Sequence, residues 1–163
     1  MPGTVEANLK KLGITLPAPA APAASYVPFT VVGNMVYISG QLPKNDNGEM
    51  IVGTLGAPLT VEEGKNAAVR CGIHLIAQMK AAADGNLDRV KKIVMVRCYV
   101  NSANNFHEHP FVANGCSELL VSVFGEKVGR HARCAFGAAQ LPFNAAVEIE
   151  AQIELESEAQ CSL

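Results

Sequence analysis

Apolar residues recur along the chain with two different periods, and each period indicates a different kind of element. A spacing of three or four residues is that of an amphipathic helix. It predicts helices over residues 4–12, from about 61 to 83 and over about 110–124. Thr60-Val61-Glu62-Glu63 is a capping box that opens the second of these helices, since its hydroxyl and carboxylate can satisfy free backbone amides. Gly125 is expected to end the third.

Runs rich in β-branched and aromatic residues lie between the helices. They predict strands at 26–32, 35–40, 90–100 and in two further runs between 129 and 155. Gly33-Asn34 suits the positive φ angles of a tight turn, so the first two strands are expected to form a hairpin. The order is then helix, two strands, helix, strand, helix, two strands. This order predicts an α+β fold, with two long helices packed on one face of a mixed β-sheet.

The last run alternates without a break between apolar and polar residues. Its polar positions are Glu148, Glu150, Gln152 and Glu154. Alternate side chains of a strand share one face, so these four project together, and a solvated sheet face is the simplest interpretation. Several carboxylates on one face also repel one another, and a nearby arginine would relieve that repulsion.

An arginine that could supply this charge interrupts the preceding run. Arg133 lies between Ala132 and Cys134, and the short Leu141-Pro142 connection predicts that its strand and the last strand are antiparallel neighbours. A planar guanidinium binds a carboxylate through two parallel hydrogen bonds. That carboxylate can belong to a neighbouring glutamate or to a ligand. Spacing alone does not choose between them; a structural ion pair is the favoured interpretation, and both alternatives stay open.

Composition narrows the classes of protein to consider. The chain has 163 residues, of which 49% are hydrophobic and 17% charged, so it is expected to bury a substantial core. A Pro/Ala run separates an amino-terminal extension, residues 1–25, from a main domain, residues 26–157, which a tail of residues 158–163 follows. The net charge of −2 and the lack of a basic stripe argue against nucleic acid as a partner.

The cysteines and the apolar segments indicate the cellular compartment in which the protein is expected. The five cysteines are far apart and form no C-x-x-C pair, as expected for reduced thiols in a cytosol-like compartment. No apolar run has the length of a membrane span, so we expect a cytoplasmic protein with no membrane partner.

Histidines are the remaining candidates for chemistry. His107-Glu108-His109 lacks the one-turn spacing of H-E-x-x-H and has no further ligand cluster. We therefore expect loop histidines beside a helix start and no metal site. His131, two residues before Arg133, can titrate near neutral pH or cap the strand.

Several segments together resemble the RidA/YjgF family, also called endoribonuclease L-PSP and translation inhibitor. They are VGNMVYISGQLP at 32–43, RVKKIVMVRCYVNSANNF at 89–106, VANGCSELLVSVFG at 112–125, HARCAFGAAQLP at 131–142 and VEIEA at 147–151. The similarity covers about residues 26–155 in family order, and the amino-terminal extension resembles that of one branch. The resemblance implies a chorismate-mutase-like fold assembled as a homotrimer with clefts between subunits. It also implies hydrolysis of reactive 2-imino or 2-enamino acids to 2-oxo acids and ammonia, without a cofactor.

Site residues follow from the same resemblance, position by position. Arg133 matches the arginine that binds the substrate carboxylate, and Glu148 matches the carboxylate that positions the attacking water. The other matches are Ser39-Gly40 with a pair whose backbone lines the pocket, Asn114 with a pocket asparagine, Tyr26 with an aromatic lid and Ala135 with a cysteine position that acts mainly through its backbone carbonyl.

Two segments depart from the family pattern. Residues 24–30 read ASYVPFT where the family has GPYSQA, and residues 107–111 also differ. Both would lie at the substrate entrance, so the resemblance implies the chemistry more firmly than the substrate. Two other functions stay open: a non-catalytic trimer that binds small carboxylates, and the endoribonuclease or translation inhibitor of the older family names.

Overall fold

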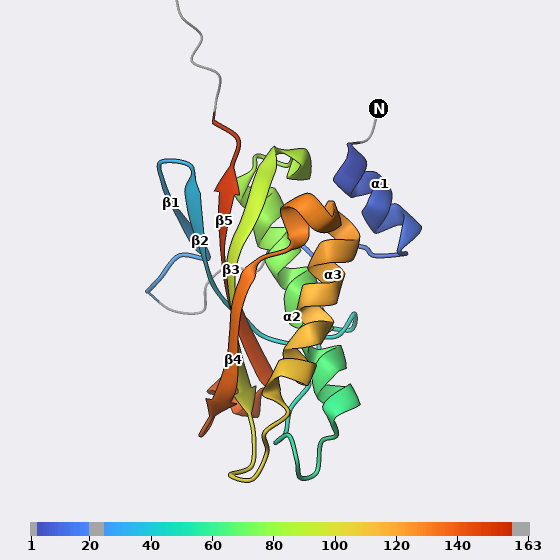
Figure 1. Ribbon diagram of the computed structural model, residues 1–163, viewed down its shortest axis with the longest axis vertical. Helices are drawn as coiled ribbons and strands as arrows, with labels where there is room; N and C mark the ends of the chain where they lie inside the picture. Colours follow the sequence, from blue (N-terminus) through green and yellow to red (C-terminus); the bar gives the residue numbers. More distant parts are fainter. Residues whose placement is uncertain (1–2, 20–24, 158–163) are drawn as a thin grey trace, which may run out of the picture.

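The chain folds into a β-sheet covered on one side by helices (Figure 1). The computed structural model describes residues 3–19 and 25–157, so the predicted tail at 158–163 lies outside the described residues. The helices are α1 (Thr4–Lys11), α2 (Val61–Ala82) and α3 (His109–Gly129). The strands are β1 (Phe29–Val32), β2 (Met35–Gln41), β3 (Val90–Asn101), β4 (Ala132–Ala138) and β5 (Val147–Leu155). The predicted order of helices and strands is confirmed.

Local signals act as the sequence predicts. The Thr60 hydroxyl accepts a hydrogen bond from the Glu63 amide at 3.3 Å, and the Glu63 carboxylate accepts one from the Thr60 amide at 2.8 Å. The capping box therefore begins α2 by satisfying its free amides. Gly33 turns the β1–β2 hairpin with φ of 60°. Gly125 leaves helical geometry with φ of 76°, but one further turn follows it and α3 ends at Gly129.

The sheet has the order β1-β2-β5-β3-β4. β3 and β4 are parallel, and every other neighbouring pair is antiparallel, so the sheet is mixed as predicted. The prediction that β4 and β5 are neighbours is wrong, because β3 lies between them. The reason is the α3 crossover: a parallel pair needs a long connection, which α3 supplies between β3 and β4. β5 then pairs with the other side of β3.

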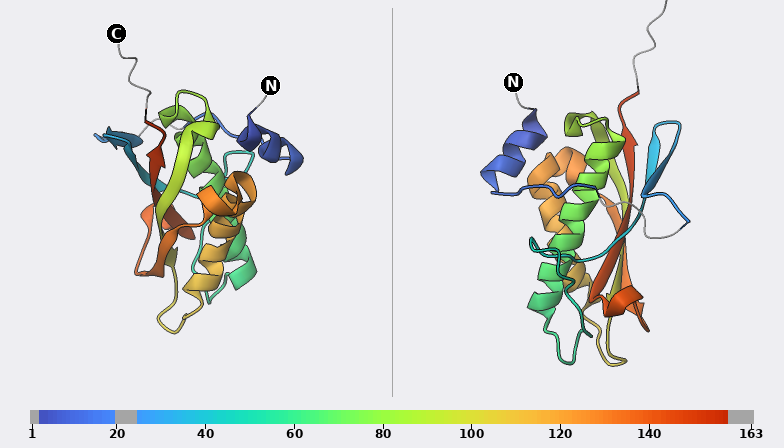
Figure 2. Two further views of the ribbon diagram at one scale, coloured as in Figure 1. Left: turned by 45° about the horizontal axis from the view of Figure 1, so that its top comes forward. Right: turned by 180° about the vertical axis from the view of Figure 1, so that it is seen from behind.

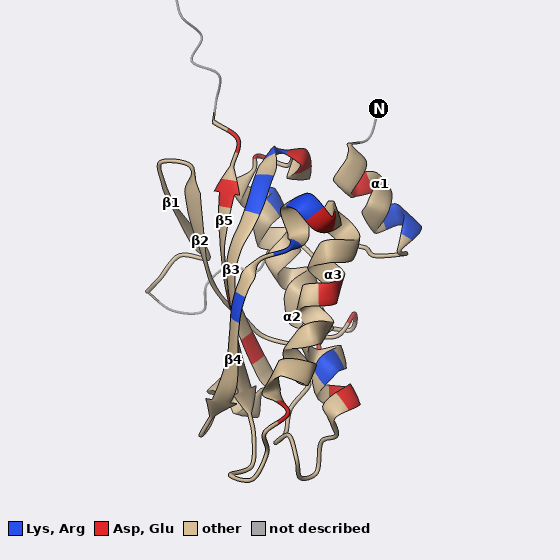
Figure 3. Ribbon diagram, in the orientation of Figure 1, with Lys and Arg blue, Asp and Glu red and all other residues tan. Residues whose placement is uncertain are grey.

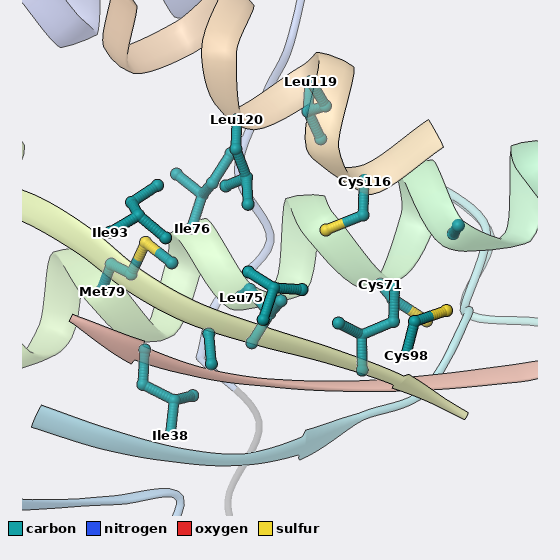
Figure 4. Packing of buried hydrophobic residues seen from close by; sticks show 14 of the residues in the cluster. Ile38, Cys71, Leu75, Ile76, Met79, Ile93, Cys98, Cys116, Leu119 and Leu120 are labelled. Carbon is teal, nitrogen blue, oxygen red and sulfur yellow. The ribbon is translucent and has the colours of Figure 1, made fainter. Parts of the chain in front are cut away.

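The core lies between the sheet and the two long helices. Figure 4 shows Ile38, Ile93 and Cys98 of the sheet facing Leu75 and Leu120 of the helices, and all five are buried. The apolar positions of β5 point into this core while its polar positions point away, as the alternation predicts. α1 packs on α3, on the side away from the sheet (Figure 2). The opposite face of the sheet, which we call the open face, is not covered by any described element (Figure 2).

None of the helices among the described residues is long and apolar enough to cross a membrane. The division of the chain at residue 25 stays a prediction.

Candidate functional site

Arg133 lies on edge strand β4 and points to the helix-covered face, toward α3. Its Nη1 donates hydrogen bonds to Asn114 Oδ1 at 2.9 Å and to Ser117 Oγ at 3.1 Å. Its Nη2 donates to the Pro110 carbonyl at 3.3 Å. All three acceptors are uncharged. Within residues 3–19 and 25–157, no carboxylate forms an ion pair with Arg133, so its charge is available to an anion that approaches this edge.

A histidine extends this hydrogen-bonded group. His131 Nε2 lies 3.0 Å from Ser117 Oγ, and its Nδ1 lies 2.6 Å from the Gly129 carbonyl oxygen. Burial is the main cause that lowers the pKa of His131, and the positive charges of Arg133 and Lys92 lower it further. We call Arg133, Asn114, Ser117 and His131 the arginine cluster.

Glu148 lies on β5 and points to the open face. It is half-buried beside Gly40, where an added Cβ would come within 2.1 Å of Glu148 Oε1. The glycine therefore makes room for the carboxylate. Burial raises the pKa of Glu148, and the charge of Glu150 raises it further. A half-buried carboxylate with a raised pKa is a stronger base than an ordinary glutamate.

The Ser39-Gly40 pair forms a bulge next to this carboxylate. β2 pairs with β5 through Ile38↔Ala151 and then Gln41↔Ile149, so one extra residue of β2 is accommodated between them. Gln41 Nε2 donates a hydrogen bond to the Ser39 carbonyl at 2.9 Å. A bulge frees backbone groups from the strand ladder and re-aims them. The resemblance assigns these two residues a backbone role, and the local geometry suits that role.

Tyr26 belongs to the same side of the molecule as the bulge. Ser39 Oγ donates to the Val27 carbonyl at 2.8 Å, which ties the segment after Tyr26 to β2. The Tyr26 side chain itself is exposed. On the open face, Glu148 lies beside Tyr99, and the Tyr99 ring contacts the Phe136 ring edge-on at 5.1 Å. We call Ser39, Gly40 and Glu148 the carboxylate cluster.

The two clusters lie on opposite faces of one sheet. Register pairs Arg133 with Val96 and Val96 with Ala151, both of which are buried under the helices. Glu148 lies an odd number of positions before Ala151 on the same strand, so its side chain projects from the other face of the sheet. A single chain therefore brings Arg133 together with Asn114, and Glu148 together with Gly40, but does not bring Arg133 and Glu148 together.

The proposed ion pair between Arg133 and a glutamate of the last strand is consequently wrong. Arg97 on β3 occupies that role instead, since its Nη1 lies 2.8 Å from Glu150 Oε1. Lys91 pairs with Glu154 in the same way, at 2.7 Å. Because β3 lies between β4 and β5, the basic residues of β3, and not Arg133 of β4, are the neighbours of the β5 glutamates.

Ala135 follows Arg133 on the same face of β4 and pairs in register with Cys98. Cys98 is buried, and burial raises the pKa of its thiol to about 12. Such a thiol stays protonated and packs as a small apolar side chain. Ala135 thus lies beside the arginine cluster with no reactive group of its own.

Two members of the arginine cluster, Ser117 and His131, had no predicted role in a binding site. Ser117 lies three residues after Asn114, which places both on one face of a helix. His131 lies two residues before Arg133, which places both on one face of a strand. Once Arg133 was a candidate binding residue, these spacings could have indicated that Ser117 and His131 lie close to it.

Two of the other histidines, His107 and His109, lie beside the start of α3, as the sequence predicts. His109 is the first residue of α3, and its Nε2 lies 3.0 Å from Ser102 Oγ. His107 is exposed in the preceding loop. Among the residues that the structure describes, no three His, Cys, Asp or Glu side chains group as metal ligands do.

Charge is spread over the molecule. Lysine and arginine segments are interspersed with aspartate and glutamate segments in Figure 3, without a continuous basic stripe in that view. Recognition by this surface is therefore more plausible through local groups such as the arginine cluster than through a long polyanion.

The fold and its clusters define a class of protein that comparison identifies. The five-stranded mixed sheet with helices on one face is a YjgF/chorismate-mutase-like α+β fold. Residues 6–155 match the family model described as "YjgF/chorismate_mutase-like, putative endoribonuclease". The chain belongs to this family, the RidA/YjgF family that its sequence resembles.

Three relatives illustrate the range of the family. Protein TCP17 of Trypanosoma cruzi is 56% identical over 155 residues, covering 95% of this chain and 96% of the relative. The crystal structure of protein Atu1372 of Agrobacterium tumefaciens, of unknown function, has 43% identity, a TM-score of 0.86 and 94% coverage of each chain. A 2-iminobutanoate/2-iminopropanoate deaminase of Dermatophagoides farinae is 29% identical over 144 residues, covering 88% of this chain and 95% of the relative.

Proposed function

We propose that this protein hydrolyses reactive 2-imino or 2-enamino acids to 2-oxo acids and ammonia. The observation that carries the proposal is Arg133: it is held by three neutral acceptors and has no carboxylate partner among the described residues. A related chain is named as a 2-iminobutanoate/2-iminopropanoate deaminase, which supports the substrate class. A guanidinium held ready in this way suits the carboxylate that every such substrate carries.

The chemistry asks little of the protein beyond positioning. Arg133 binds the substrate carboxylate, and Glu148 holds a water and takes a proton from it as the oxygen attacks C2 of the imine. The attack on the protonated imine gives a neutral carbinolamine. Glu148 then returns its proton to the amino nitrogen, the C–N bond breaks, and the hydroxyl gives its proton to the Glu148 carboxylate as the C=O bond forms, so that ammonia and the 2-oxo acid leave. The imine carbon is already electrophilic, so orientation and one carboxylate base can provide the acceleration. The raised pKa of Glu148 brings it closer to the working pH of a base.

The two clusters would have to meet across subunits. Arg133 and Glu148 face opposite sides of one sheet, and the open face exposes large side chains such as Tyr37 and Phe136. Packing the open face of one copy against the β4 edge of the next would cover these side chains and bring the two clusters together. We propose a homotrimer for this assembly, with the number of copies taken from the family resemblance.

A coupled assay tests the activity. An amino-acid oxidase generates a 2-imino acid in the presence of semicarbazide, and the purified protein should speed release of the 2-oxo acid at the expense of the semicarbazone. Arg133→Ala should lower kcat/KM by about a hundredfold, because the carboxylate loses its charged partner. Arg70→Ala is the matched control, since Arg70 of α2 is already paired with Asp46. The proposal fails if the wild type does not accelerate release or if Arg133→Ala is as active as Arg70→Ala.

The same arginine also supports a second function, a non-catalytic carboxylate binder. Binding of 2-oxobutanoate that depends on Arg133, with no turnover across a panel of imines, would favour that alternative. The ribonuclease of the older family names would need a basic surface for RNA, which the net charge of −2 does not favour.

A further inference from the structure

The hydrogen bonds around His131 fix which ring nitrogen carries its hydrogen. The Gly129 carbonyl can only accept, so Nδ1, at 2.6 Å from it, must carry the hydrogen and donate. In the neutral ring Nε2 then has a lone pair. Nε2 lies 3.0 Å from Ser117 Oγ, so the Ser117 hydroxyl donates its hydrogen to His131.

The direction of this bond prepares Ser117 to receive Arg133. With its hydrogen committed to His131, the Ser117 oxygen presents its lone pairs to Arg133 Nη1 at 3.1 Å. Asn114 Oδ1 accepts from the same nitrogen at 2.9 Å. One guanidinium nitrogen is thereby held by two acceptors on the same face of α3. These hydrogen bonds all point in one direction. Arg133 donates to Ser117, Ser117 donates to His131, and His131 donates to the Gly129 carbonyl.

We propose that His131, acting through the hydroxyl of Ser117, is a positioning residue that holds Arg133 in the orientation that binds a ligand carboxylate, and that protonation of His131 releases this hold. A protonated ring carries hydrogen on Nε2, which must then donate toward Ser117 as well. Ser117 receives two cationic donors, and its own hydrogen loses its acceptor. The ligand part of this inference rests on the proposed function.

The surroundings of the cluster make it accessible and sensitive to charge. Ser117, His131 and Arg133 line one side of a groove of about 530 Å³ between α3 and β4. The charged groups around His131 are Arg133 on β4, Lys92 on β3, Glu118 and Glu126 on α3, and Arg130 just after α3.

Most of the negative charge in this groove is already paired. Glu118 pairs with Lys65 at 2.9 Å, and Glu126 pairs with Arg130. Arg133 and Lys92 lower the pKa of His131, in the same direction as its burial. The hydrogen bond to the Gly129 carbonyl raises the pKa, but the net shift is downward, so His131 gains its proton at a lower pH than an unperturbed histidine.

Nuclear magnetic resonance of the full chain without ligand tests the coupling itself. As the pH is lowered from about 8 to about 5, the Arg133 Nε–H resonance should shift with the same midpoint as the His131 ring. In Ser117→Ala, His131 should still titrate but the Arg133 resonance should no longer follow it. An Arg133 resonance that ignores His131 in the wild type, or follows it equally in Ser117→Ala, would overturn the proposal.

Binding of 2-oxobutanoate, measured by calorimetry, tests the consequence. Ser117→Ala and His131→Ala should each raise Kd by about fivefold near pH 7.5, because the first removes one of the three acceptors of Arg133 and the second leaves that acceptor without the group that orients it. His131→Gln should stay within about twofold, since glutamine offers an N–H and a carbonyl oxygen for the same two hydrogen bonds and does not titrate.

The pH dependence separates the two proposals. Between about pH 7.5 and 5.5 the wild-type Kd should rise severalfold while that of His131→Gln stays flat. A wild-type Kd that falls on acidification would mean that His131 is a second cation for the ligand, and the positioning role would be wrong. If wild-type protein does not bind 2-oxobutanoate at all, the proposed function fails, and the resonance experiment alone still decides the coupling.

Discussion

At the scale of single residues, arginines of the same chain differ in whether folding has neutralised them. Arg97 and Arg70 lie 2.8 and 2.5 Å from carboxylate oxygens of Glu150 and Asp46. Arg133 has only neutral acceptors among the described residues, although its pattern of apolar neighbours resembles that of Arg97. An unneutralised guanidinium fixed by three hydrogen bonds is organised for a ligand rather than for stability.

Gly40 is the residue on which the position of Glu148 depends. In Gly40→Ala the added carbon would lie 2.1 Å from Glu148 Oε1, so the carboxylate must move. We expect imine hydrolysis to fall by about a hundredfold in kcat, the usual contribution of a positioned base. Thr30→Ala, at an exposed position of β1, is the control and should keep wild-type activity. Wild-type kcat in Gly40→Ala would exclude Glu148 as the base.

Glu148→Gln should make the protein more stable at neutral pH while it removes activity. Because the pKa of Glu148 is raised, the folded chain binds its proton more tightly than the unfolded chain does. Ionisation thus costs folded-state stability as the pH rises above the ordinary value of 4.5. In urea unfolding, Glu148→Gln should have a higher free energy of unfolding than the wild type at pH 7, and this difference should vanish below pH 4.5. A less stable variant at pH 7 would mean that the carboxylate makes a stabilising contact.

At the scale of elements, α2 and α3 approach closely at one glycine. A Cβ at Gly115 would lie 2.1 Å from the Lys65 backbone oxygen, which cannot move without moving α2. In an exposed helix Gly→Ala would stabilise by about 1 kcal/mol. Here we expect Gly115→Ala to lower the free energy of unfolding by about 1–3 kcal/mol, because overpacking dominates. Urea unfolding measures it, with exposed Ser122→Ala on the same helix as a control that should change by less than about 0.5 kcal/mol.

How far the sequence predicts these elements depends on the range of the forces involved. The capping box at Thr60 and the alternation of β5 are local, and both are confirmed. Strand order is not local: it depends on the α3 crossover, so the expected pairing of β4 with β5 was wrong. The same limit explains why a glutamate of β5 was considered as the partner of Arg133, whereas Arg97 forms that ion pair. Family resemblance singled out Arg133 and Glu148, but no spacing could show that they face opposite sides of the sheet.

At the scale of the whole molecule, one chain does not bring together the two groups that the proposed function requires. Phe136 is 44% exposed and Tyr37 42% exposed on the open face, although both lie in strands of a central sheet. Exposed aromatic residues next to a half-buried carboxylate are typical of a surface that another subunit covers. The arginine cluster and the carboxylate cluster would then belong to two copies in every site.

Mixing inactive subunits tests this arrangement directly. Arg133→Ala lacks one cluster and Glu148→Gln lacks the other, so each variant alone should be inactive. When the two are co-refolded at equal amounts, a site is complete if its arginine comes from a Glu148→Gln subunit and its carboxylate from an Arg133→Ala subunit. Random assembly into a closed ring makes about one quarter of the sites complete, so about one quarter of wild-type activity should return.

The controls of the mixing experiment fix its meaning. Each variant refolded alone gives the background, and co-purification of differently tagged copies of the two variants after refolding shows that their subunits mix. If one chain supplied both groups, no mixture of the two variants could contain a complete site, and activity would stay at background even when co-purification shows mixed oligomers. Recovery of activity would therefore require that Arg133 and Glu148 meet across a subunit boundary, as their positions on opposite faces of the sheet demand.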